Sequence, residues 1–366
     1  MSEPDPLSVD LDTLPLQPQR WMYVLSLILR RHNWQHASKA KGVGHRTNEA
    51  RARLCIWVFR FLRDNPVKTF KLDPRSFSGR HVDLLMAHWQ SEAKAGRLAP
   101  STIPTYYSHL KTFTRWIGKP KLLKPISAYF DDPALYTRSY CASEDKSWRA
   151  MGVDVFAVIR DVEAHDVHAA ACLWLMVAFG LRFKESLMLR PHADVATPAQ
   201  AARATGASAD QADGPVTDYL DTHRGTKGGR RRYLPIDDEL RRHAVDYARQ
   251  VCKGPHASVS DQTLTLVQAM RRLRYVMERF GITKRDLHVV PHGLRHQFAG
   301  RGYTLNTGVL PPVAGGPLDD AALDARARDT ISEQLGHGRR QIVSAYLGQS
   351  AVMRSKGIKP SDPPMK

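Results

Sequence analysis

The stretch "PHGLRHQFAGRGY" (residues 291–303) places two histidines four residues apart with an arginine between them. On a helix, this spacing puts His292 and His296 on one face, as in a metal site. The fixed positive charge of Arg295 opposes a divalent cation, and helical zinc motifs of this kind carry a glutamate between the histidines instead. The stretch leaves three interpretations open: a metal site, a DNA-reading helix, or part of a catalytic centre.

The net charge of the chain helps to decide between these three interpretations. The chain has 366 residues, enough for two domains with apolar cores, and its hydrophobic share of 42% fits a folded protein rather than a disordered one. Its 54 Lys and Arg residues exceed its 36 Asp and Glu residues, which gives a formal net charge of +18 at pH 7. A charge of that size favours a polyanionic partner, with nucleic acid as the leading candidate.

The spacing of the cysteines and the length of the apolar runs indicate in which cellular compartment the protein works. The four cysteines form no CxxC pair, so the sequence indicates neither a zinc cluster nor a disulfide framework, and reduced thiols in a cytosol fit best. They are Cys55, Cys141, Cys172 and Cys252. The longest apolar run, 169–181, is too short to span a bilayer and predicts a buried core helix. The acidic, proline-rich N-terminus is not typical of a signal peptide, so we expect a cytoplasmic protein without a membrane partner.

Helical periodicity dominates the first third of the chain. Amphipathic stretches there predict helices at 45–64, 78–96 and 100–119, and Ser78 and Ser101 are suitable N-caps for the second and third. The apolar stripe of the first stretch runs through Leu54, Trp57, Val58, Phe61 and Leu62. The sequence therefore predicts an all-helical first domain with basic faces.

Polar and proline-rich segments divide the chain. Residues 1–17 have the composition of a disordered N-terminus, and 118–146 carry "KPKLLKP" and "DDP" without periodicity, as a linker does. We therefore expect a helical domain over 18–117, a second domain over 147–350 and a polar tail without a fold of its own over 351–366.

The second domain is mostly helical, with one strand signal. In 216–236 an apolar alternation is broken by "GTKGG", which predicts a β-hairpin. The Ala- and Asp-rich stretch 192–214 has few large apolar side chains and predicts a mobile insertion, and 303–321 resembles a second one. The expected fold class is thus mainly α with a small antiparallel β-hairpin or sheet in the second domain.

Short stretches of the second domain carry the residue types that phosphodiester chemistry needs. They are "AFGLRFKESLMLRP" with Arg182, "GTKGGRRRYLPI" with Lys227, "PHGLRHQFAGRGY" with His292 and Arg295, and "SEQLGHGRRQIVSAYLG" with His337 and Tyr346. Arginine forks neutralise phosphate oxygens, tyrosine forms a covalent phosphoryl link, and histidine or lysine moves the protons. No acidic triad suited to a two-metal nuclease is evident in the sequence.

The order of these motifs resembles the catalytic domain of the tyrosine recombinases, the phage-integrase family. "HGLRHQFA" and "LGH" are near-verbatim family motifs, and Tyr346 follows "LGH" at the family's spacing. "LAPSTIPTYYSHLKTFTRWIGK" resembles the core-binding domain of proteobacterial prophage integrases. The resemblance covers nearly the whole chain and implies a helical, SAM-like core-binding domain followed by a mixed α/β catalytic domain.

By this resemblance, Tyr346 attacks the scissile phosphate and leaves a 3′-phosphotyrosine and a free 5′-hydroxyl. Lys227 protonates the departing 5′-oxygen, and His292 helps to take the tyrosine proton. Because the bond energy stays in the covalent link, the resemblance implies no ATP, no metal and no other cofactor.

The same resemblance gives the remaining residues supporting roles. Arg182 and Arg295 clamp the phosphate oxygens and stabilise the pentacoordinate transition state. His337 hydrogen-bonds a non-bridging oxygen, and His296 is a buried support. Tyr303 is a competing nucleophile by its proximity to Arg295, although it lacks the spacing from "LGH".

The expected partner is double-stranded DNA at attachment or recombination sites, in the cytoplasm at the bacterial nucleoid. The resemblance implies a basic clamp around one duplex, a monomer when free, a homotetramer on DNA, and accessory DNA-bending or directionality factors. The basic side chains that we expect to contact DNA are Arg46, Arg51, Arg53, Lys111, Arg115, Arg230 and Arg231.

The favoured hypothesis is a recombinase that integrates or excises a prophage or other mobile element. A resolvase, invertase or topoisomerase-like relative would share the chemistry, and motifs do not separate these products. A DNA-binding protein without catalysis and a metal-dependent hydrolase built on His292 and His296 are the remaining alternatives.

Overall fold

The structure of the chain falls into two units, Met1–Ser139 and Tyr140–Lys366. It is a computed structural model, and it describes residues 10–11, 13–36, 40–65, 71–205, 218–226, 229–317 and 319–360. Each unit has its own buried apolar core. The boundary between them lies inside the segment 118–146 that the sequence analysis assigned to a linker.

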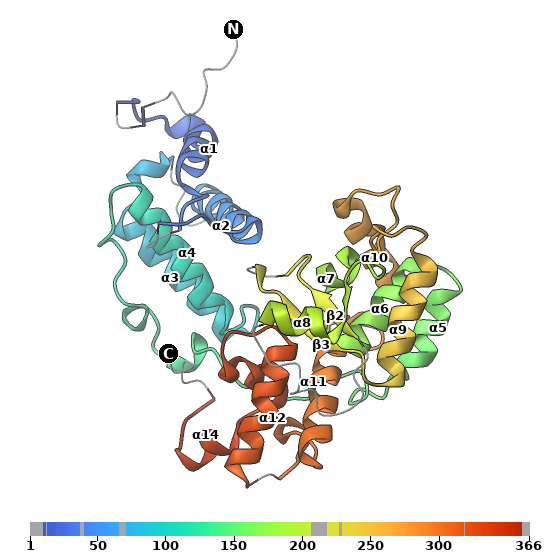
Figure 1. Cartoon of the computed structure of the whole chain (residues 1–366). Coiled ribbons are helices and arrows are strands. Elements are labelled where there is room, and N and C mark those ends of the chain that lie inside the picture. Colours follow the sequence, from blue (N-terminus) through green and yellow to red (C-terminus); the bar gives the residue numbers. More distant parts are fainter. Residues whose placement is uncertain are drawn as a thin grey trace. The chain divides into compact units, whose positions relative to one another are not determined.

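In its described part, the first unit is built from four α-helices (Figure 1). They are α1 Trp21–His32, α2 His45–Arg63, α3 Gly79–Lys94 and α4 Thr102–Trp116. Helix α3 begins with a capping box, in which the Ser78 backbone N–H donates to His81 Nδ1 at 3.0 Å. The three helices that the sequence predicted in this unit are confirmed within a few residues at their ends.

The core of the first unit is centred on three fully buried phenylalanines. Phe59 on α2 lies 5.9 Å from Phe77 and 5.5 Å from Phe113 on α4, measured between ring centroids. Phe77 and Phe113 are 6.0 Å apart, and all three pairs meet edge to face, which is a favourable geometry for aromatic rings. These contacts tie α2 and α4 to the turn that precedes α3.

The predicted apolar stripe of α2 is partly wrong at Trp57. Its side chain is 39% exposed and stacks on Phe61 at 5.3 Å, at the edge of the unit. The buried face instead carries Leu54, Cys55, Val58, Phe59 and Leu62, the spacing of a helix with one buried side. Trp57 is apolar but lies one position off that buried face, so the stripe predicted from apolar residues includes it.

Two segments outside the predicted first domain pack onto this unit. Leu123 and Phe130 are buried in its core, so the first part of the predicted linker belongs to the unit. Leu11 is also buried, and Arg75 donates to the backbone oxygens of Leu11 and Leu14 at 2.6 Å. The predicted disorder therefore does not hold for residues 10–17 as far as they are described, while 1–9 and 12 lie outside the described residues.

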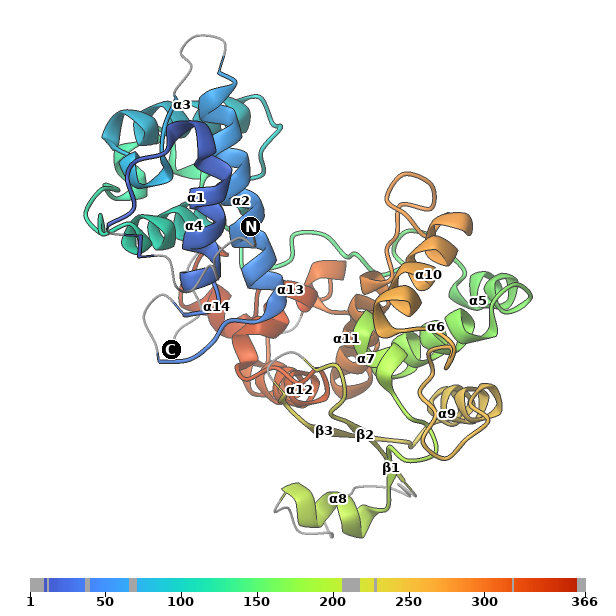
Figure 2. The same cartoon turned by 90° about the horizontal axis from the view of Figure 1, so that it is seen from above.

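The second unit combines helices with a small sheet that lies at its edge in Figure 2. The helices are α5 Val155–Glu163, α6 Val167–Phe179, α7 Phe183–Met188, α8 Pro198–Thr205, α9 Glu239–Val251, α10 Leu266–Arg279, α11 His292–Thr307, α12 Ala321–Gln334, α13 Ser344–Leu347 and α14 Ala351–Ser355. Strands β1 Val195–Ala196, β2 Tyr219–Thr222 and β3 Arg232–Pro235 pair antiparallel in the order β1-β2-β3. The predicted fold class, mainly α with a small antiparallel sheet, is confirmed.

Helix α6 is the centre of the second unit. It is apolar on all sides, and every residue from 169 to 179 is buried. It packs against α5, α7, α9 and α11. It ends at Gly180, whose φ of 60° is left-handed and leaves the last carbonyl groups of the helix without helical partners. The predicted core helix is confirmed, and no helix in the described ranges is long and apolar enough to cross a membrane.

The predicted mobile insertions and tail contain more regular structure than expected. Within 192–214, β1 and α8 occupy the part that is described, because an alanine-rich sequence also favours helix. Helix α11 runs on into 303–321 as far as Thr307. In the tail, α14 follows α13 directly, and Tyr140 N–H donates to Pro360 O at 2.8 Å.

Candidate active site

Arg295, in the first turn of α11, is the centre of the candidate site. Its side chain is fully buried, and four of its N–H groups have acceptors. They donate to Gly180 O, to Leu335 O at 2.5 Å, to Tyr346 Oη at 3.2 Å and to His337 Nε2 at 3.3 Å. Every one of these acceptors is neutral, so the described chain buries this charge without a carboxylate hydrogen-bonded to it.

The way the chain folds explains how this charge is held. Gly180 and Leu335 are the C-caps of α6 and α12, and the carbonyl groups at a helix C-terminus carry partial negative charge. Two helix ends therefore converge on one guanidinium. Burial still lowers the pKa of Arg295 to about 10, which leaves it charged at neutral pH. A buried charge compensated only by dipoles favours the binding of an anion.

Two further arginines share one buried glutamate beside it. Arg182, the N-cap of α7, donates from Nη1 to Glu185 Oε1 at 2.6 Å, and Arg232 on β3 donates from Nη2 to Glu185 Oε2 at 2.7 Å. Burial opposes ionisation of Glu185, but Arg232 and Arg182 outweigh it and lower the pKa of the carboxyl to about 2. With Arg295, three cationic side chains face one anionic one, so the cluster carries a net charge of about +2.

Tyr346, on α13, places its hydroxyl against this cluster. Its side chain is 8% exposed, and its ring lies among three histidines. The ring centroids are 5.8 Å from His292, 4.7 Å from His296 and 5.5 Å from His337. Besides burial, the charge of Arg182 lowers the pKa of His292 and His337, so Arg182 lies close to these rings. The structure thus brings together five of the six predicted catalytic residues: Arg182, His292, Arg295, His337 and Tyr346.

Burial and the neighbouring arginines keep the histidines neutral. Burial, then Arg295 and Arg182, lower the pKa of His292 to about 4 and that of His337 to about 3. Burial and then His292 lower the pKa of His296 to about 4. Because Arg295 donates to His337 Nε2, the proton of that neutral ring sits on Nδ1. Neutral His292 is in the form that accepts a proton.

The sixth predicted catalytic residue, Lys227, lies outside the described residues. The competing tyrosine, Tyr303, is fully buried and donates from its hydroxyl to Asp324 Oδ1 at 2.8 Å. Burial raises the pKa of Tyr303, and the hydrogen bond to Asp324 raises it further. This environment keeps the Tyr303 hydroxyl protonated and inaccessible, and it favours Tyr346 as the nucleophile.

The surroundings of His292 and His296 do not favour a metal site. Their rings meet edge to face with centroids 5.5 Å apart. In the described part of the chain, no group of three His, Cys, Asp or Glu side chains has an arrangement that holds a metal ion. The net positive charge of the arginine cluster would also repel a cation.

The candidate DNA-contacting residues fall into distinct environments. Arg51 is wrong as a surface contact, because its side chain is 6% exposed and donates to Gln35 O at 3.1 Å inside the first unit. Arg231 pairs with Asp221 through two hydrogen bonds of 2.8 and 2.5 Å. Arg230 is exposed and donates to His337 O at 2.6 Å, at the edge of the candidate site.

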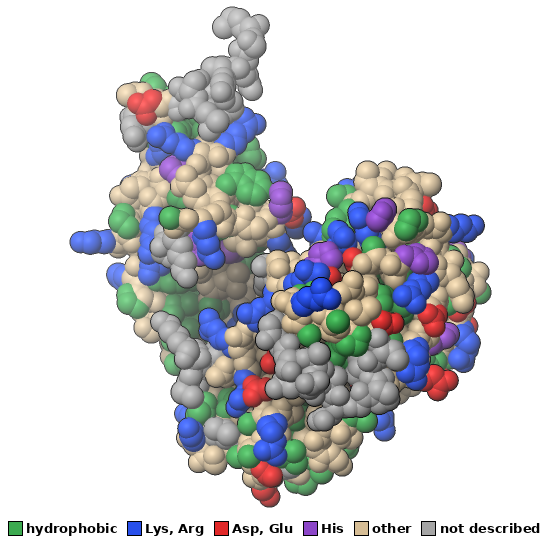
Figure 3. All heavy atoms as spheres, viewed as in Figure 1, with side chains coloured by type: hydrophobic (Ala, Val, Ile, Leu, Met, Phe, Trp, Pro, Cys, Tyr) green, Lys and Arg blue, Asp and Glu red, His purple; other side chains and the backbone are tan. Residues whose placement is uncertain are grey.

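The remaining candidates are exposed. They are Arg46, Arg53, Lys111 and Arg115, all on the first unit. Lys and Arg side chains are spread over the visible surface of both units (Figure 3). Apart from Arg51, then, the predicted basic residues of the first unit are placed where a polyanion reaches them.

Two residues of the cluster, Glu185 and Arg232, were not predicted from the sequence. Both are buried and hydrogen-bonded to each other. A signal for Glu185 was present, since a glutamate three residues after Arg182 is the capping-box spacing, and its Oε2 does accept the Arg182 N–H at 2.9 Å. Arg232 is the third of three consecutive arginines, and only strand alternation separates it from exposed Arg231.

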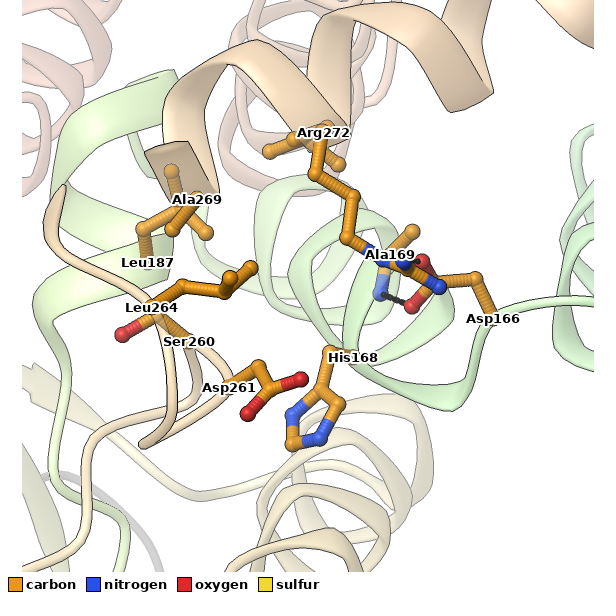
Figure 4. A pocket seen from close by; sticks show the side chains of 10 residues that line it. Asp166, His168, Ala169, Leu187, Ser260, Asp261, Leu264, Ala269 and Arg272 are labelled. Atoms are coloured by element: carbon orange, nitrogen blue, oxygen red, sulfur yellow. Dashed lines mark hydrogen bonds and ion pairs between the residues drawn. The ribbon is translucent and has the colours of Figure 1, made fainter. Parts of the chain in front are cut away.

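A small pocket at the start of α6 is separate from this cluster (Figure 4). Asp166 caps the helix by accepting the Ala169 N–H at 3.0 Å and accepts from Arg272 Nε at 2.6 Å. The volume of about 20 Å³ suits a water molecule rather than a substrate. The pocket therefore offers no alternative active site.

Comparison with known proteins gives a match to one family model and a shared fold. The model of the integrase family matches residues 140–301, the region that contains Arg182, His292 and Arg295. A comparison with curated proteins gave no match.

Solved structures share the fold at low identity. A lambda integrase (75–356) dimer bound to a COC′ core site has a TM-score of 0.51 and 14% identity, over 87% of this chain and 93% of that one. A lambda integrase tetramer bound to a Holliday junction has a TM-score of 0.51 and 13% identity, over 95% and 83%. XerH recombinase in a post-cleavage complex with palindromic difH has a TM-score of 0.52 and 10% identity, over 95% and 97%. The model of the integrase family thus matches part of the second unit, and the solved recombinases share the fold of the chain.

Proposed function

We propose that this protein is a site-specific DNA recombinase that cuts and rejoins strands through a 3′-phosphotyrosyl intermediate on Tyr346. One observation carries the proposal: a fully buried arginine, which among the described residues is hydrogen-bonded only to neutral acceptors, donates to the hydroxyl of the tyrosine at 3.2 Å. The buried charge of Arg295 calls for an anion, and the nucleophile is already in contact with the group that binds it. A phosphodiester satisfies both requirements.

The charge of the site matches the charge of the reaction. A phosphodiester carries one negative charge, and its pentacoordinate transition state carries about two. Arg182, Arg232 and Arg295, less the charge of Glu185, supply about +2, so the site stabilises the transition state more than the ground state. The arginines thereby provide the positive charge that a metal ion supplies in other phosphoryl transferases.

Protons move between neutral and cationic side chains. As Tyr346 Oη forms its bond to phosphorus, its proton passes to His292, whose lowered pKa keeps it deprotonated beforehand. The bond to the 5′-oxygen breaks, and that oxygen takes a proton, in our proposal from Lys227. His337 donates from Nδ1 to a non-bridging oxygen, and His296 supports the ring of Tyr346. A 5′-hydroxyl from the partner duplex reverses these steps and completes the exchange.

The partners follow from the same chemistry. The substrate is double-stranded DNA at attachment or recombination sites of a prophage or other mobile element, so the protein works in the cytoplasm, at the nucleoid. The exposed basic residues of the first unit, the core-binding domain in this proposal, hold the duplex. Among the structures that share the fold, lambda integrase is a dimer on a COC′ core site and a tetramer on a Holliday junction. We propose a monomer in free solution and a homotetramer on DNA, aided by accessory bending or directionality factors.

The proposal is tested by trapping the covalent intermediate. Wild type, Tyr346→Phe and Tyr303→Phe are incubated in EDTA with supercoiled plasmid that carries the DNA junctions flanking the protein's own gene, and are quenched with SDS. Wild type and Tyr303→Phe should give a protein–DNA adduct, and Tyr346→Phe should give none. An adduct in Tyr346→Phe would move the nucleophile elsewhere, and an adduct that requires added metal would overturn the proposed chemistry.

A further inference from the structure

The helix that carries Tyr346 is too short to hold itself in place. Helix α13 has four residues, Ser344–Leu347, and helices of this length are unstable in isolation. It is followed by Gly348, whose φ of 79° marks a sharp change of direction. The position of the Tyr346 hydroxyl must therefore be fixed by contacts from other elements.

One side chain on α12 bonds both ends of this short helix. Arg328 is 1% exposed and donates from Nη1 to Ser344 Oγ at 3.3 Å and to Gly348 O at 3.1 Å. It also donates from Nη2 to Gln349 O at 3.4 Å. The rigid fork of the guanidinium thus spans the residues before and after Tyr346.

A buried carboxylate holds this arginine and extends the network. Asp324, one helical turn before Arg328, is 1% exposed, and its Oδ1 accepts from Arg328 Nε at 2.8 Å. The same oxygen accepts from Tyr303 on α11, and Oδ2 accepts the backbone N–H of Ala351 at 3.1 Å. The pair therefore links α11, α12, α13 and α14 around the short helix.

We propose that the buried Asp324–Arg328 pair positions Tyr346 for attack, an inference that rests on the proposed function. Buried ion pairs contribute little net stability compared with apolar packing, and their best-attested use is to specify one arrangement. Here the arrangement specified is that of the nucleophile. A displacement of about 1 Å at a reacting atom slows a reaction by about 100-fold, whereas DNA held by other residues is bound as before.

The experiment compares matched variants of the full-length protein. Arg328→Met removes the fork, Asp324→Asn removes the charge that holds it, and Ser344→Ala is a milder change that removes one acceptor. Asp166→Asn is the control, because it removes another buried carboxylate paired with an arginine, the half-exposed Arg272, at the far end of α6 (Figure 4). For each variant we would measure the thermal midpoint, the affinity for the flanking-junction plasmid, the adduct rate at saturating DNA, and amide hydrogen exchange.

The positioning role predicts a specific pattern. Asp324→Asn and Arg328→Met should lower the adduct rate by 10- to 100-fold with DNA affinity changed by less than about threefold, and exchange should speed up over 344–351. Ser344→Ala should show the same trend in smaller measure. Asp166→Asn should lose thermal stability without either effect. Equal loss of adduct rate in Asp166→Asn, or unchanged exchange over 344–351 in Arg328→Met, would overturn the inference.

The exchange measurement needs no DNA, so it separates this inference from the proposed function. If wild type forms no adduct, the proposed function fails, and the exchange data still decide whether the pair orders the Tyr346 segment. If wild type forms an adduct and the variants keep its full rate, the positioning role alone fails.

Discussion

At the scale of single residues, the site depends on an imbalance between cations and anions. In the part of the chain that the structure describes, Arg295 has only neutral hydrogen-bond acceptors, while Arg182 and Arg232 share Glu185. Completing these pairs with further carboxylates would stabilise the folded chain but would cancel the charge that attracts a phosphate. The excess positive charge of the site therefore lowers the stability of the fold and favours the binding of an anion.

The variant Glu185→Gln tests this balance. It removes the only carboxylate hydrogen-bonded to either Arg182 or Arg232 among the described contacts and leaves two buried or half-buried guanidinium groups unpaired. We expect the free energy of unfolding to fall by about 3–5 kcal/mol, as when one partner of a buried pair is lost. Urea denaturation would measure this loss. Inorganic sulfate should restore more stability to the variant than to wild type, and equal effects would contradict this account.

At the scale of elements, the ends of helices build the site. The C-terminus of α6 is the clearest case, because Gly180 both ends the helix and offers its carbonyl oxygen to Arg295. A Cβ atom on Gly180 would lie 2.6 Å from Phe298 Cδ1 and would also have to accept a φ of 60°.

The variant Gly180→Ala should therefore be more harmful than the same change at Gly308. Gly308 caps α11 with a φ of 75°, but a Cβ there meets no atom within 4 Å. We expect a loss of about 1 kcal/mol for Gly308→Ala from backbone strain alone, and about 2–4 kcal/mol for Gly180→Ala from strain plus overpacking. Calorimetry of both variants measures the difference, and equal losses would show that the contact with Phe298 relaxes freely.

The elements also show how far sequence reasoning reaches. Helices α3 and α6 were predicted because periodicity, caps and apolar runs are local signals. Arg51 was predicted to be exposed and is buried, and Trp57 was predicted to lie in the apolar stripe and is partly exposed. Residue spacing along a helix does not show how far neighbouring elements cover the two edges of its apolar face. Glu185 had a local signal in its capping-box spacing from Arg182, but Arg232 had none. Its pairing with Glu185 joins α7 to β3, and no local pattern records a contact between residues that far apart in the chain.

At the scale of the whole molecule, charge acts over both units. A net charge of +18 makes association with DNA depend strongly on counterion release, whatever sequence is recognised. The same charge makes the folded chain repel itself, and protonation of further groups adds to that repulsion as the pH falls. The groups that matter most for stability in acid are therefore those that are neutral in the folded state and become protonated when the chain unfolds.

Three such groups are His292, His296 and His337, whose folded pKa values are lowered to about 4, 4 and 3. Below their ordinary pKa of about 6.5, these histidines are protonated in the unfolded chain but stay neutral in the folded chain. Stability contributed by these histidines is therefore complete above about pH 6.5 and is lost as the pH falls toward 4, by about 2–3 kcal/mol for each. Glu185 does not contribute over most of this window, because with a folded pKa of about 2 and an ordinary value of about 4.5 it matters only at lower pH.

Calorimetry of the full chain between pH 7 and 4.5 measures this dependence in the transition of the second unit. A variant with His292→Asn and His337→Asn should lose about two thirds of the slope that wild type shows, because only His296 still titrates between the folded and unfolded states. The comparison concerns slopes, so a general loss of stability in the variant does not affect it. An unchanged slope would mean that His292 and His337 are already protonated in the folded state at mildly acidic pH. His292 would then lack the neutral form that accepts the Tyr346 proton.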